Sequence, residues 1–433
     1  MSEHRPRLVR SIPRLDARVR APSSKSLTIR AMAAAALAPG RSRILRPLRA
    51  DDTRLMADAL AAIGIGTTWD PGGDVVVDGA GGKIPARGAA IALGNAGTPL
   101  RLLTAVCTLG AGRFLIDGDS RMRQRPSRHL IDALGSLGIA IRSVPGTGCP
   151  PIEILAGGFP GGRVTLPGDA SSQYLTALLM TAPCGASPLE VEVTGPLVSR
   201  PYVDLTVHLL GESGVKVARD GWSRFRVTPT PYIPRDITIE GDASSASYFF
   251  AAAAVTGGRV EVTGIPTGSL QGDLRFLDLI AGMGCRVVRD GVGIIVEGTD
   301  SLRGIDADLS DTPDLVPTCA ATALFARGAT HLANIPHLRI KESDRIASVA
   351  ACARAFGARA EDTRDSLTII PPPGGRGDLL RGAVIDPAGD HRLAMAFAVA
   401  GLAIEGTRIA DPGCVAKSYP GFFEDLDSLT SAR

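Results

Sequence analysis

Two kinds of helix alternate along this chain. One kind is apolar on nearly every face, as in residues 251–255 and 320–326, and this pattern predicts a helix enclosed by other elements. The other kind has a polar face, as in DTRLMADALAAIG, and ends in a glycine followed by a short strand. Five such glycines, 70 to 76 residues apart, fit the left-handed position after a helix: Gly64, Gly138, Gly214, Gly284 and Gly357.

The same alternation is visible as an internal repeat. The segments PGDASSQYLTALLM and EGDASSASYFFAAA both enter a predicted buried helix, and their aspartates, Asp169 and Asp242, lie 73 residues apart. Weaker relatives recur at similar spacing, near Ser24, Thr98, Asp314 and His391. Six units of about 73 residues therefore account for the chain. Each unit is predicted to run, in cyclic order, as strand, buried helix, strand, amphipathic helix, strand and strand.

One unit of this size would leave its helix faces exposed, whereas three units can enclose a core. We therefore expect an α/β (α+β) protein of two pseudo-symmetric domains, each with three βαβαββ repeats. The sixth amphipathic helix, near residues 422–429, has no strand after it. The N-terminal segment 7–19 is a candidate to supply that strand.

Composition narrows the class of protein. Hydrophobic residues make up 45% of the 433 residues and charged residues 21%, as in globular proteins. A net charge of +3 is too small to indicate nucleic-acid binding, and 4% aromatic residues leave few rings to stack on bases. The alanine-rich run 31–38 is too short to span a bilayer. The seven cysteines form no CxxC pair, which indicates reduced thiols and no zinc site. These features predict a cytoplasmic protein that binds no membrane.

Charged and hydroxyl side chains gather just before the predicted helices. Examples are Ser24-Lys25-Ser26, the Arg121–Pro126 loop RMRQRP, Lys341-Glu342 and Asp390-His391-Arg392. Helix N-termini favour anions, and arginine grips phosphates and carboxylates through its planar fork. A single loop arginine is usually solvated, and a serine or aspartate before a helix is often a cap. The prediction of an anion site therefore depends on recurrence at equivalent positions of the repeat.

Ten motifs, taken in order, carry a resemblance to a known family. They are SSKSLTIR, LGNAGTPLR, RMRQRP, GDASSQYLTALL, SRPYVD, GDASSAS, TPD, RIKESDR, GDHRLAMA and AKSYP. With these motifs the chain resembles the 5-enolpyruvylshikimate-3-phosphate synthase family along its full length. The resemblance implies a two-domain inside-out α/β prism, with residues 1–21 and 241–433 in one domain and 22–240 in the other. It also implies an active site in the interdomain cleft.

The resemblance further implies a reaction and its residues. The enolpyruvyl group of phosphoenolpyruvate moves to the 5-hydroxyl of shikimate 3-phosphate, through a tetrahedral intermediate, and without a metal or organic cofactor. The residues implied for shikimate 3-phosphate are Lys25, Ser26, Arg30, Ser171, Ser172, Gln173, Ser199, Tyr202, Asp314 and Lys341. Those implied for phosphoenolpyruvate are Lys25, Asn95, Gly97, Arg125, Gln173, Arg345, Arg392 and Lys417. Asp314 is the implied base and Glu342 the implied acid, with Lys25 a competing candidate for one proton step.

Some positions depart from the commonest family pattern. Ser23 stands where glycine usually precedes the Ser-Lys pair, and His337 stands where many members have asparagine. No ligand contact is carried over to His337, which is equally well explained as an ordinary loop histidine. Gly97 leaves room in the phosphoenolpyruvate pocket, so we expect glyphosate to compete with that substrate.

Three other functions remain to be weighed. UDP-N-acetylglucosamine enolpyruvyl transferase shares the fold and chemistry but carries a catalytic cysteine, or occasionally an aspartate, in the loop matching residues 119–126, which here contains no cysteine. An RNA-binding or RNA-end-processing repeat protein would need a wider basic surface and stacking aromatics. A non-catalytic scaffold would leave the charged residues at matching helix starts unexplained. We expect a monomer acting on small molecules.

Overall fold

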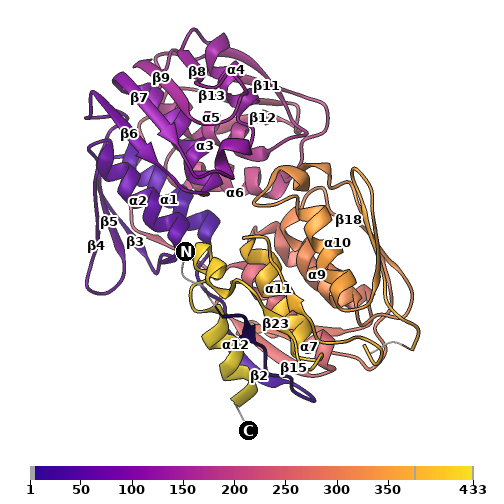
Figure 1. The fold of residues 1–433 in the computed structure, drawn as a ribbon. Coiled ribbons are helices and arrows are strands. Elements are labelled where there is room, and N and C mark those ends of the chain that lie inside the picture. The colour runs from indigo at the N-terminus through magenta and orange to yellow at the C-terminus, as the bar shows by residue number, and fades with distance from the viewer. Residues whose placement is uncertain (1–4, 375–376, 432–433) are drawn as a thin grey trace. The chain divides into compact units, whose positions relative to one another are not determined.

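The computed structural model describes residues 5–374 and 377–431. The chain divides into two compact units (Figure 1). Unit 1 comprises Met1–Pro22 with Glu240–Arg433, and unit 2 comprises Ser23–Ile239. Unit 1 is thus discontinuous in sequence, and unit 2 is inserted into it.

Unit 2 is built around three buried helices. These are α1 (Lys25–Leu37), α3 (Gly97–Val106) and α5 (Ser172–Thr181), and α3 packs against both of the others. Ten consecutive residues of α1 are buried, because its alanine-rich sequence gives every face an apolar surface. The outer helices bury one face only: α2 (Asp51–Ala62), α4 (Arg128–Ser136) and α6 (Arg200–Glu212). Short 3-10 turns follow α3 and α5, η1 (Cys107–Leu109) and η3 (Ala182–Cys184).

Three four-stranded sheets surround this core. The first has the order β14 (Ile237–Thr238), β3 (Pro39–Leu45), β5 (Val75–Ala80) and β4 (Gly66–Trp69). The second has the order β6 (Gly88–Ala92), β7 (Ala111–Asp117), β9 (Ile152–Gly157) and β8 (Ala140–Ser143). The third has the order β10 (Gly162–Pro167), β11 (Leu189–Thr194), β13 (Arg224–Val227) and β12 (Val217–Asp220). In each sheet the first two strands are parallel and the remaining pairs are antiparallel.

Unit 1 repeats this plan. Its buried helices are α7 (Ala243–Thr256), α9 (Val316–Ala323) and α11 (His391–Gly401), and all three pack on one another. Its outer helices are α8 (Phe276–Gly282), α10 (Arg345–Ala355) and α12 (Phe422–Ser431). Every residue of α7 and of α11 is buried. The predicted fully apolar helices are therefore confirmed as the centre of each unit.

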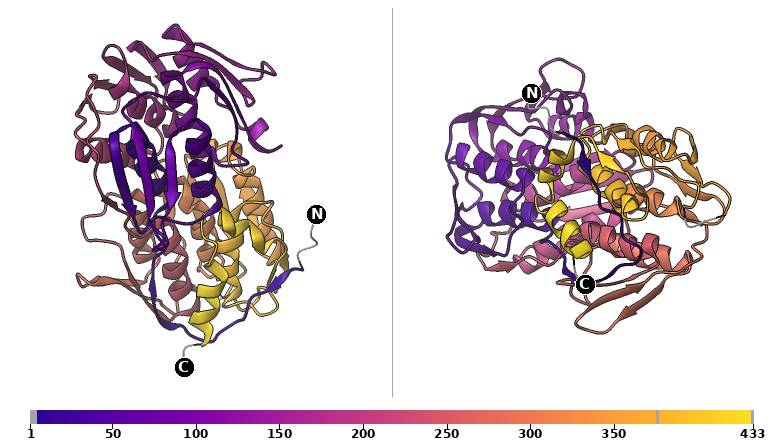
Figure 2. Two further views of the ribbon diagram at one scale, coloured as in Figure 1. Left: turned by 90° about the vertical axis from the view of Figure 1, so that its left-hand side faces the viewer. Right: turned by 60° about the horizontal axis from the view of Figure 1, so that its bottom comes forward.

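Two sheets of unit 1 have four strands and the third has three. The first has the order β16 (Arg286–Arg289), β17 (Gly293–Glu297), β15 (Arg259–Thr263) and β2 (Asp16–Arg20). The second has the order β18 (Asp306–Asp308), β19 (Thr330–Ala333), β21 (Leu367–Ile370) and β20 (Arg359–Asp362). The third has the order β1 (Arg7–Leu8), β23 (Arg408–Ile409) and β22 (Val384–Ile385). Figure 2 shows the indigo N-terminal segment beside the yellow C-terminal part of this unit, where β1 pairs antiparallel with β23. The predicted completion of the last repeat by the N-terminus is confirmed.

The cyclic order predicted for the repeat is confirmed, and at two places a strand and the helix that follows it lie in different units. Strand β2 pairs with β15 in unit 1, whereas the next helix, α1, lies in unit 2. Strand β14 pairs with β3 in unit 2, whereas the next helix, α7, lies in unit 1. At these crossings a strand and the helix after it serve different cores. The five glycines that end the amphipathic helices all have φ between 84° and 110°, as their pattern predicted.

Candidate functional site

The starts of the buried helices in unit 2 are tied together by side chains. Gln173 at the start of α5 donates from Nε2 to Thr98 Oγ1 on α3, 3.1 Å away. Arg30 on α1 donates from Nε to Thr206 Oγ1 on α6, 2.9 Å away. Thr206 Oγ1 also lies 3.1 Å from Thr176 Oγ1 on α5. Because these contacts lie in the first two turns of each helix, the positive helix ends of α1, α3 and α5 meet at one end of the unit.

Lys25 is the first residue of α1 and forms a buried ion pair. Its Nζ lies 3.1 Å from Asp52 Oδ2 at the start of α2. Ser24 caps α1 by accepting from Leu27 N. The sequence showed the Asp51-Asp52 pair at a helix start but gave Asp52 no role. Acidic residues are common in a first helical turn, so the pattern alone did not distinguish an ion-pair partner from a residue that complements the dipole.

A second group in unit 2 joins α3 to the RMRQRP loop, which contains η2 (Met122–Gln124). Arg125, 4% exposed, donates from Nη1 to Asn95 Oδ1 at 2.7 Å and to Asn95 O at 3.1 Å. A Cβ at Gly97 would lie 2.8 Å from nitrogen atoms of both Arg101 and Arg125. Two guanidinium groups therefore flank a position where any larger residue would displace them. Sequence reasoning missed Arg101, although it lies within the LGNAGTPLR motif.

Arg30, 2% exposed, organises the residues assigned to shikimate 3-phosphate in unit 2. It donates from Nη1 to Ser26 O at 3.1 Å and from Nη2 to Tyr202 O at 3.3 Å. Burial lowers the pKa of Arg30 to about 10, which keeps the group charged at neutral pH. Among the assigned serines, Ser171 caps α5 by accepting from Gln173 N at 3.2 Å, and Ser199 precedes α6 with a φ of 55°. The capping explanation thus holds for Ser171 and does not prevent its hydroxyl from donating to a ligand.

Three carboxylates of unit 1 converge on one buried guanidinium. Arg345, the first residue of α10, is 1% exposed. Its Nη1 lies 2.9 Å from Asp314 Oδ1 and its Nη2 lies 2.8 Å from Glu342 Oε2. Its Nε lies 2.8 Å from Asp390 Oδ2. The two predicted proton-transfer carboxylates are therefore held by the same side chain.

Asp314 lies in η5 (Pro313–Leu315), directly before α9. Its Oδ2 accepts from Arg392 Nη2 at 2.6 Å. Burial alone would raise the pKa of Asp314. The positive charges of Arg392 and Arg345, and then of Lys341, outweigh that effect and hold this pKa below its ordinary value. Asp314 is therefore ionised at neutral pH and able to accept a proton.

Two acidic residues of unit 1 were seen at helix starts but received no role from the sequence. Asp390 is fully buried, caps α11 by accepting from Arg392 N, and also binds Arg345. Asp273, in η4 (Gly272–Arg275), accepts a hydrogen bond from Ser244 Oγ. Burial, followed by the charge of Asp314, raises the pKa of Asp273 to about 6. Only the folded chain shows that both acids lie against the charged cluster.

Three further residues of unit 1 lie in or next to 3-10 helices. Lys341 directly follows η6 (Pro336–Ile340), and Lys417 ends η7 (Pro412–Lys417). His337, within η6, is 3% exposed, and neither ring nitrogen has a hydrogen-bond partner among the described residues. Burial and then Lys341 lower the pKa of His337 to about 3, so the ring is neutral. The loop-histidine explanation therefore fails, because this side chain is buried beside the cluster.

The two groups of side chains differ in what they can do. In unit 2, four basic side chains, Lys25, Arg30, Arg101 and Arg125, lie at or near the helix starts, which suits anion binding. In unit 1, cations alternate with carboxylates, which suits proton transfer beside a bound anion. Among the described residues, no group of three or more His, Cys, Asp or Glu side chains is arranged to hold a metal ion.

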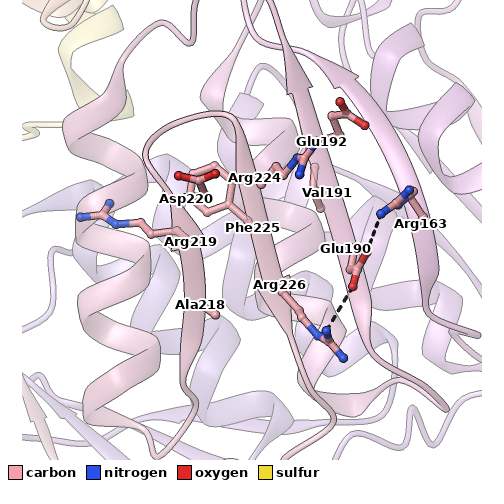
Figure 3. A pocket seen from close by; sticks show the side chains of 10 residues that line it. All are labelled: Arg163, Glu190, Val191, Glu192, Ala218, Arg219, Asp220, Arg224, Phe225 and Arg226. Carbon is pink, nitrogen blue, oxygen red and sulfur yellow. Dashed lines mark hydrogen bonds and ion pairs between the residues drawn. The ribbon is translucent and has the colours of Figure 1, made fainter.

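A hollow on the outer face of the third sheet of unit 2 is a different kind of surface (Figure 3). Arg163 and Arg226 lie 3.2 Å and 3.3 Å from the carboxylate of Glu190, between them. Cross-strand register also places Arg224 opposite Glu192. These charges compensate one another across the strands, as is usual on a solvated sheet face. The hollow contains none of the predicted site residues.

Comparison with known proteins agrees with this geometry. The family model described as EPSP synthase (3-phosphoshikimate 1-carboxyvinyltransferase) matches residues 9–426. The chain belongs to the EPSP synthase family. Proteins named 3-phosphoshikimate 1-carboxyvinyltransferase are similar to it over nearly their whole length. The one from Methanoculleus marisnigri is 46% identical over 414 residues, covering 95% of this chain and 96% of the relative. The one from Nitrosomonas europaea is 42% identical over 423 residues, covering 97% of each.

Solved structures of similar proteins match the fold of nearly the whole chain. EPSP synthase from Acinetobacter baumannii matches with a TM-score of 0.78 and 25% identity, covering 98% of this chain and 97% of that one. The enolpyruvyl transferase NikO from Streptomyces tendae, 20% identical with a TM-score of 0.75, shows the same fold. The predicted family and the predicted two-domain α/β fold are therefore confirmed. Within the described residues, every helix is too short or too polar to bridge a lipid bilayer.

Proposed function

We propose that this chain transfers the enolpyruvyl group of phosphoenolpyruvate to the 5-hydroxyl of shikimate 3-phosphate and releases phosphate. The observation that carries this proposal is the cluster in which Arg345 binds both Asp314 and Glu342 while Arg392 also binds Asp314. It brings a carboxylate held in its ionised form and a second carboxyl group to the same cationic surface. Addition–elimination at an enol ether needs two such groups.

The anionic groups of the substrates account for the basic residues. The two substrates together carry about six negative charges near neutral pH. Shikimate 3-phosphate is assigned to Lys25, Ser26, Arg30, Ser171, Ser172, Gln173, Ser199, Tyr202, Asp314 and Lys341. Phosphoenolpyruvate is assigned to Lys25, Asn95, Gly97, Arg125, Gln173, Arg345, Arg392 and Lys417. Both sets include residues of unit 1 and of unit 2, so the proposed reaction needs both domains, 1–21 with 241–433 and 22–240.

Two carboxyl groups divide the proton transfers. Asp314 removes the proton of the 5-hydroxyl as its oxygen bonds to C2 of phosphoenolpyruvate, and a weakly basic carboxylate is sufficient because bond formation acidifies that proton. Glu342 gives its proton to C3, which becomes a methyl group. The tetrahedral intermediate then loses phosphate, which takes the proton held by Asp314, as C3 returns a proton to Glu342 and the double bond re-forms. Lys25, paired with Asp52, is the alternative group for one of these proton steps.

The rival transferase that uses UDP-N-acetylglucosamine is disfavoured by the loop at residues 119–126. Asp119 is the acidic residue there, and its Oδ1 accepts from Met122 N at 2.8 Å, which gives it a structural role in the turn. We also infer that the protein is a cytoplasmic monomer that acts on small molecules and not on nucleic acid.

A phosphate-release assay tests the function directly. Shikimate 3-phosphate with phosphoenolpyruvate should release phosphate at the same rate with and without a metal chelator. UDP-N-acetylglucosamine in place of shikimate 3-phosphate should release none. Release only with the nucleotide sugar, or none with shikimate 3-phosphate, would contradict the proposal.

A further inference from the structure

Tyr174 is a buried polar side chain that the proposed reaction does not yet use. It follows Gln173 in α5 and is 1% exposed. Burial raises the pKa of Tyr174, so its hydroxyl keeps its proton at neutral pH and serves as a hydrogen-bond donor. Its Oη donates to Pro126 O at 2.6 Å, and its ring lies edge-on to that of His129, with the ring centroids 6.1 Å apart. This tyrosine therefore joins a buried helix to the end of the RMRQRP loop.

The carbonyl of Pro126 is a point at which the loop, α5 and α3 meet. It accepts a second hydrogen bond, from Arg101 Nη2 on α3 at 3.1 Å. Arg101 also donates from Nη1 to Gly97 O, at the start of α3, at 3.1 Å. A proline has no N–H, so this carbonyl is the only backbone group through which Pro126 can be hydrogen-bonded. The two donors thus fix the loop against both helices.

Arg125 directly precedes this anchored carbonyl. Its backbone N donates to Met122 O at 3.0 Å, which closes the turn before it. Its guanidinium reaches Asn95 and donates to Oδ1 at 2.7 Å. Because Arg125 and Pro126 share a peptide bond, a shift of the Pro126 backbone moves the base of the Arg125 side chain. The position of this guanidinium therefore depends on what holds Pro126.

We propose that Tyr174 is a positioning residue for phosphoenolpyruvate: its hydroxyl holds the Pro126 backbone and thereby sets the place of the Arg125 guanidinium. The inference rests on the proposed function, because Arg125 is assigned to this substrate. Binding of a carboxylate or phosphate by arginine depends on the alignment of its planar fork, so a small displacement weakens the contact. In this role the tyrosine acts through Arg125 and takes no part in proton transfer.

Tyr174→Phe removes the hydroxyl and keeps the ring beside His129. Pro126 O retains its hydrogen bond from Arg101, so the variant should fold. In the phosphate-release assay, kcat/KM for phosphoenolpyruvate should fall about fivefold, while kcat and the KM for shikimate 3-phosphate should stay within about twofold of the wild type. A rise in one KM at constant kcat is the result expected when binding of that substrate, and not the chemical step, is weakened.

Tyr232→Phe is the matched control. Tyr232 is also 1% exposed, and its Oη donates to Met180 O at 2.6 Å, near the other end of α5. This variant loses the same kind of buried hydrogen bond, so its urea midpoint should fall at least as far as that of Tyr174→Phe. Its kinetic constants should match those of the wild type. An equal fall of kcat/KM for phosphoenolpyruvate in both variants would trace the effect to lost stability and would overturn the inference.

A double-mutant cycle with Arg125→Ala tests the route of the effect. If Tyr174 acts through Arg125, Tyr174→Phe should lower kcat/KM for phosphoenolpyruvate less than about twofold when residue 125 is already alanine. An effect of about fivefold in both backgrounds would overturn the inference. An unchanged kcat/KM in Tyr174→Phe alone would overturn it too. A wild type that does not turn over shikimate 3-phosphate with phosphoenolpyruvate would instead contradict the proposed function, and the inference with it.

Discussion

In unit 1, the side chain of Arg345 fixes the positions of several carboxylates. Three of its nitrogens face the carboxylates of Asp314, Glu342 and Asp390. Burial alone would lower the pKa of Arg345, but the three carboxylates, with Asp390 the strongest, raise it above its ordinary value. Removing one member of such a buried network leaves an uncompensated charge, which typically costs about 3–5 kcal/mol. The positions of both proposed proton-transfer groups therefore depend on this guanidinium.

The proton-transfer roles predict the effect of conservative substitutions. Asp314→Asn and Glu342→Gln keep the size of each side chain and an oxygen that can accept from Arg345, but neither amide can transfer the proton. Each should lower kcat at least about a hundredfold in the phosphate-release assay. Glu361→Gln, on exposed β20, is the matched control and should turn over normally. Near-normal turnover in Asp314→Asn or Glu342→Gln would remove that residue from its role.

Gly97 predicts the behaviour of the phosphoenolpyruvate pocket. A Cβ there would press on nitrogens of Arg101 and Arg125 at 2.8 Å, so Gly97→Ala must displace at least one guanidinium. We expect the KM for phosphoenolpyruvate to rise severalfold and inhibition by glyphosate, competitive in the wild type, to weaken more strongly. Steady-state inhibition kinetics measure both constants. A wild type that millimolar glyphosate does not inhibit would contradict the competition on which this prediction depends.

Asp273 predicts a pH-dependent change in stability. Its pKa in the folded protein is about 6, above the ordinary value of 3.8, so the folded state binds more protons and loses stability as pH rises from about 4 to about 7. Asp273→Asn cannot ionise and still accepts from Ser244. The free energy of unfolding of Asp273→Asn, relative to that of the wild type, should therefore increase by about 2–3 kcal/mol between pH 4 and pH 7. Chemical unfolding of both proteins at pH 4 and pH 7 measures the difference, and a constant difference would contradict the prediction.

At the scale of helices and strands, many of the candidate site residues lie at the N-termini of helices. Lys25, Gly97, Arg345 and His391 are each the first residue of a helix, and Ser24, Asp344 and Asp390 cap such starts with their side chains. The repeat therefore positions a helix end and its adjacent loop in the same way several times over. The helix N-terminus and the loop before it recur in each repeat. Together they supply the positive end of the helix dipole and the basic side chains.

The glycines that end the amphipathic helices give a test at this scale. Gly138 has a φ of 86°, and a Cβ added there would meet nothing within 4 Å. Gly138→Ala should therefore destabilise unit 2 by about 1 kcal/mol, from backbone strain alone. Gly64 has the same φ, but its Cβ would also lie 3.0 Å from Pro85 Cβ. In urea unfolding, Gly64→Ala should lower the free energy of unfolding more than Gly138→Ala does. Equal losses would show that Pro85 moves to make room for the added Cβ.

At the scale of the whole molecule, the residues assigned to each substrate are divided between two compact units. Unit 2 holds Lys25, Ser26, Arg30, Asn95, Gly97, Arg125, Ser171, Ser172, Gln173, Ser199 and Tyr202, and unit 1 holds Asp314, Lys341, Glu342, Arg345, Arg392 and Lys417. Because each proposed substrate needs residues of both units, ligand binding should favour a more compact arrangement of the chain. Addition of shikimate 3-phosphate with glyphosate should reduce the radius of gyration in solution scattering. An unchanged radius would contradict ligand-driven closure.

The sequence by itself determined the repeat, the buried and amphipathic helices, the glycine helix ends and the N-terminal completion of the last repeat. These features depend on local periodicity and backbone conformation, which are determined by residues close together in the sequence. The motifs also identified Asp314, Glu342, Arg345 and Arg392 as candidates.

Only the tertiary structure decided which charges meet. Asp52, Asp273 and Asp390 are ordinary residues in sequence, and packing brings their partners Lys25, Ser244 and Arg345 to them. Arg101 and Arg125 likewise flank Gly97 only because the RMRQRP loop folds onto α3. The burial of His337 was decided in the same way. Contacts, burial and the resulting pKa shifts depend on distances in space, which cannot be derived from the separation of residues in the sequence.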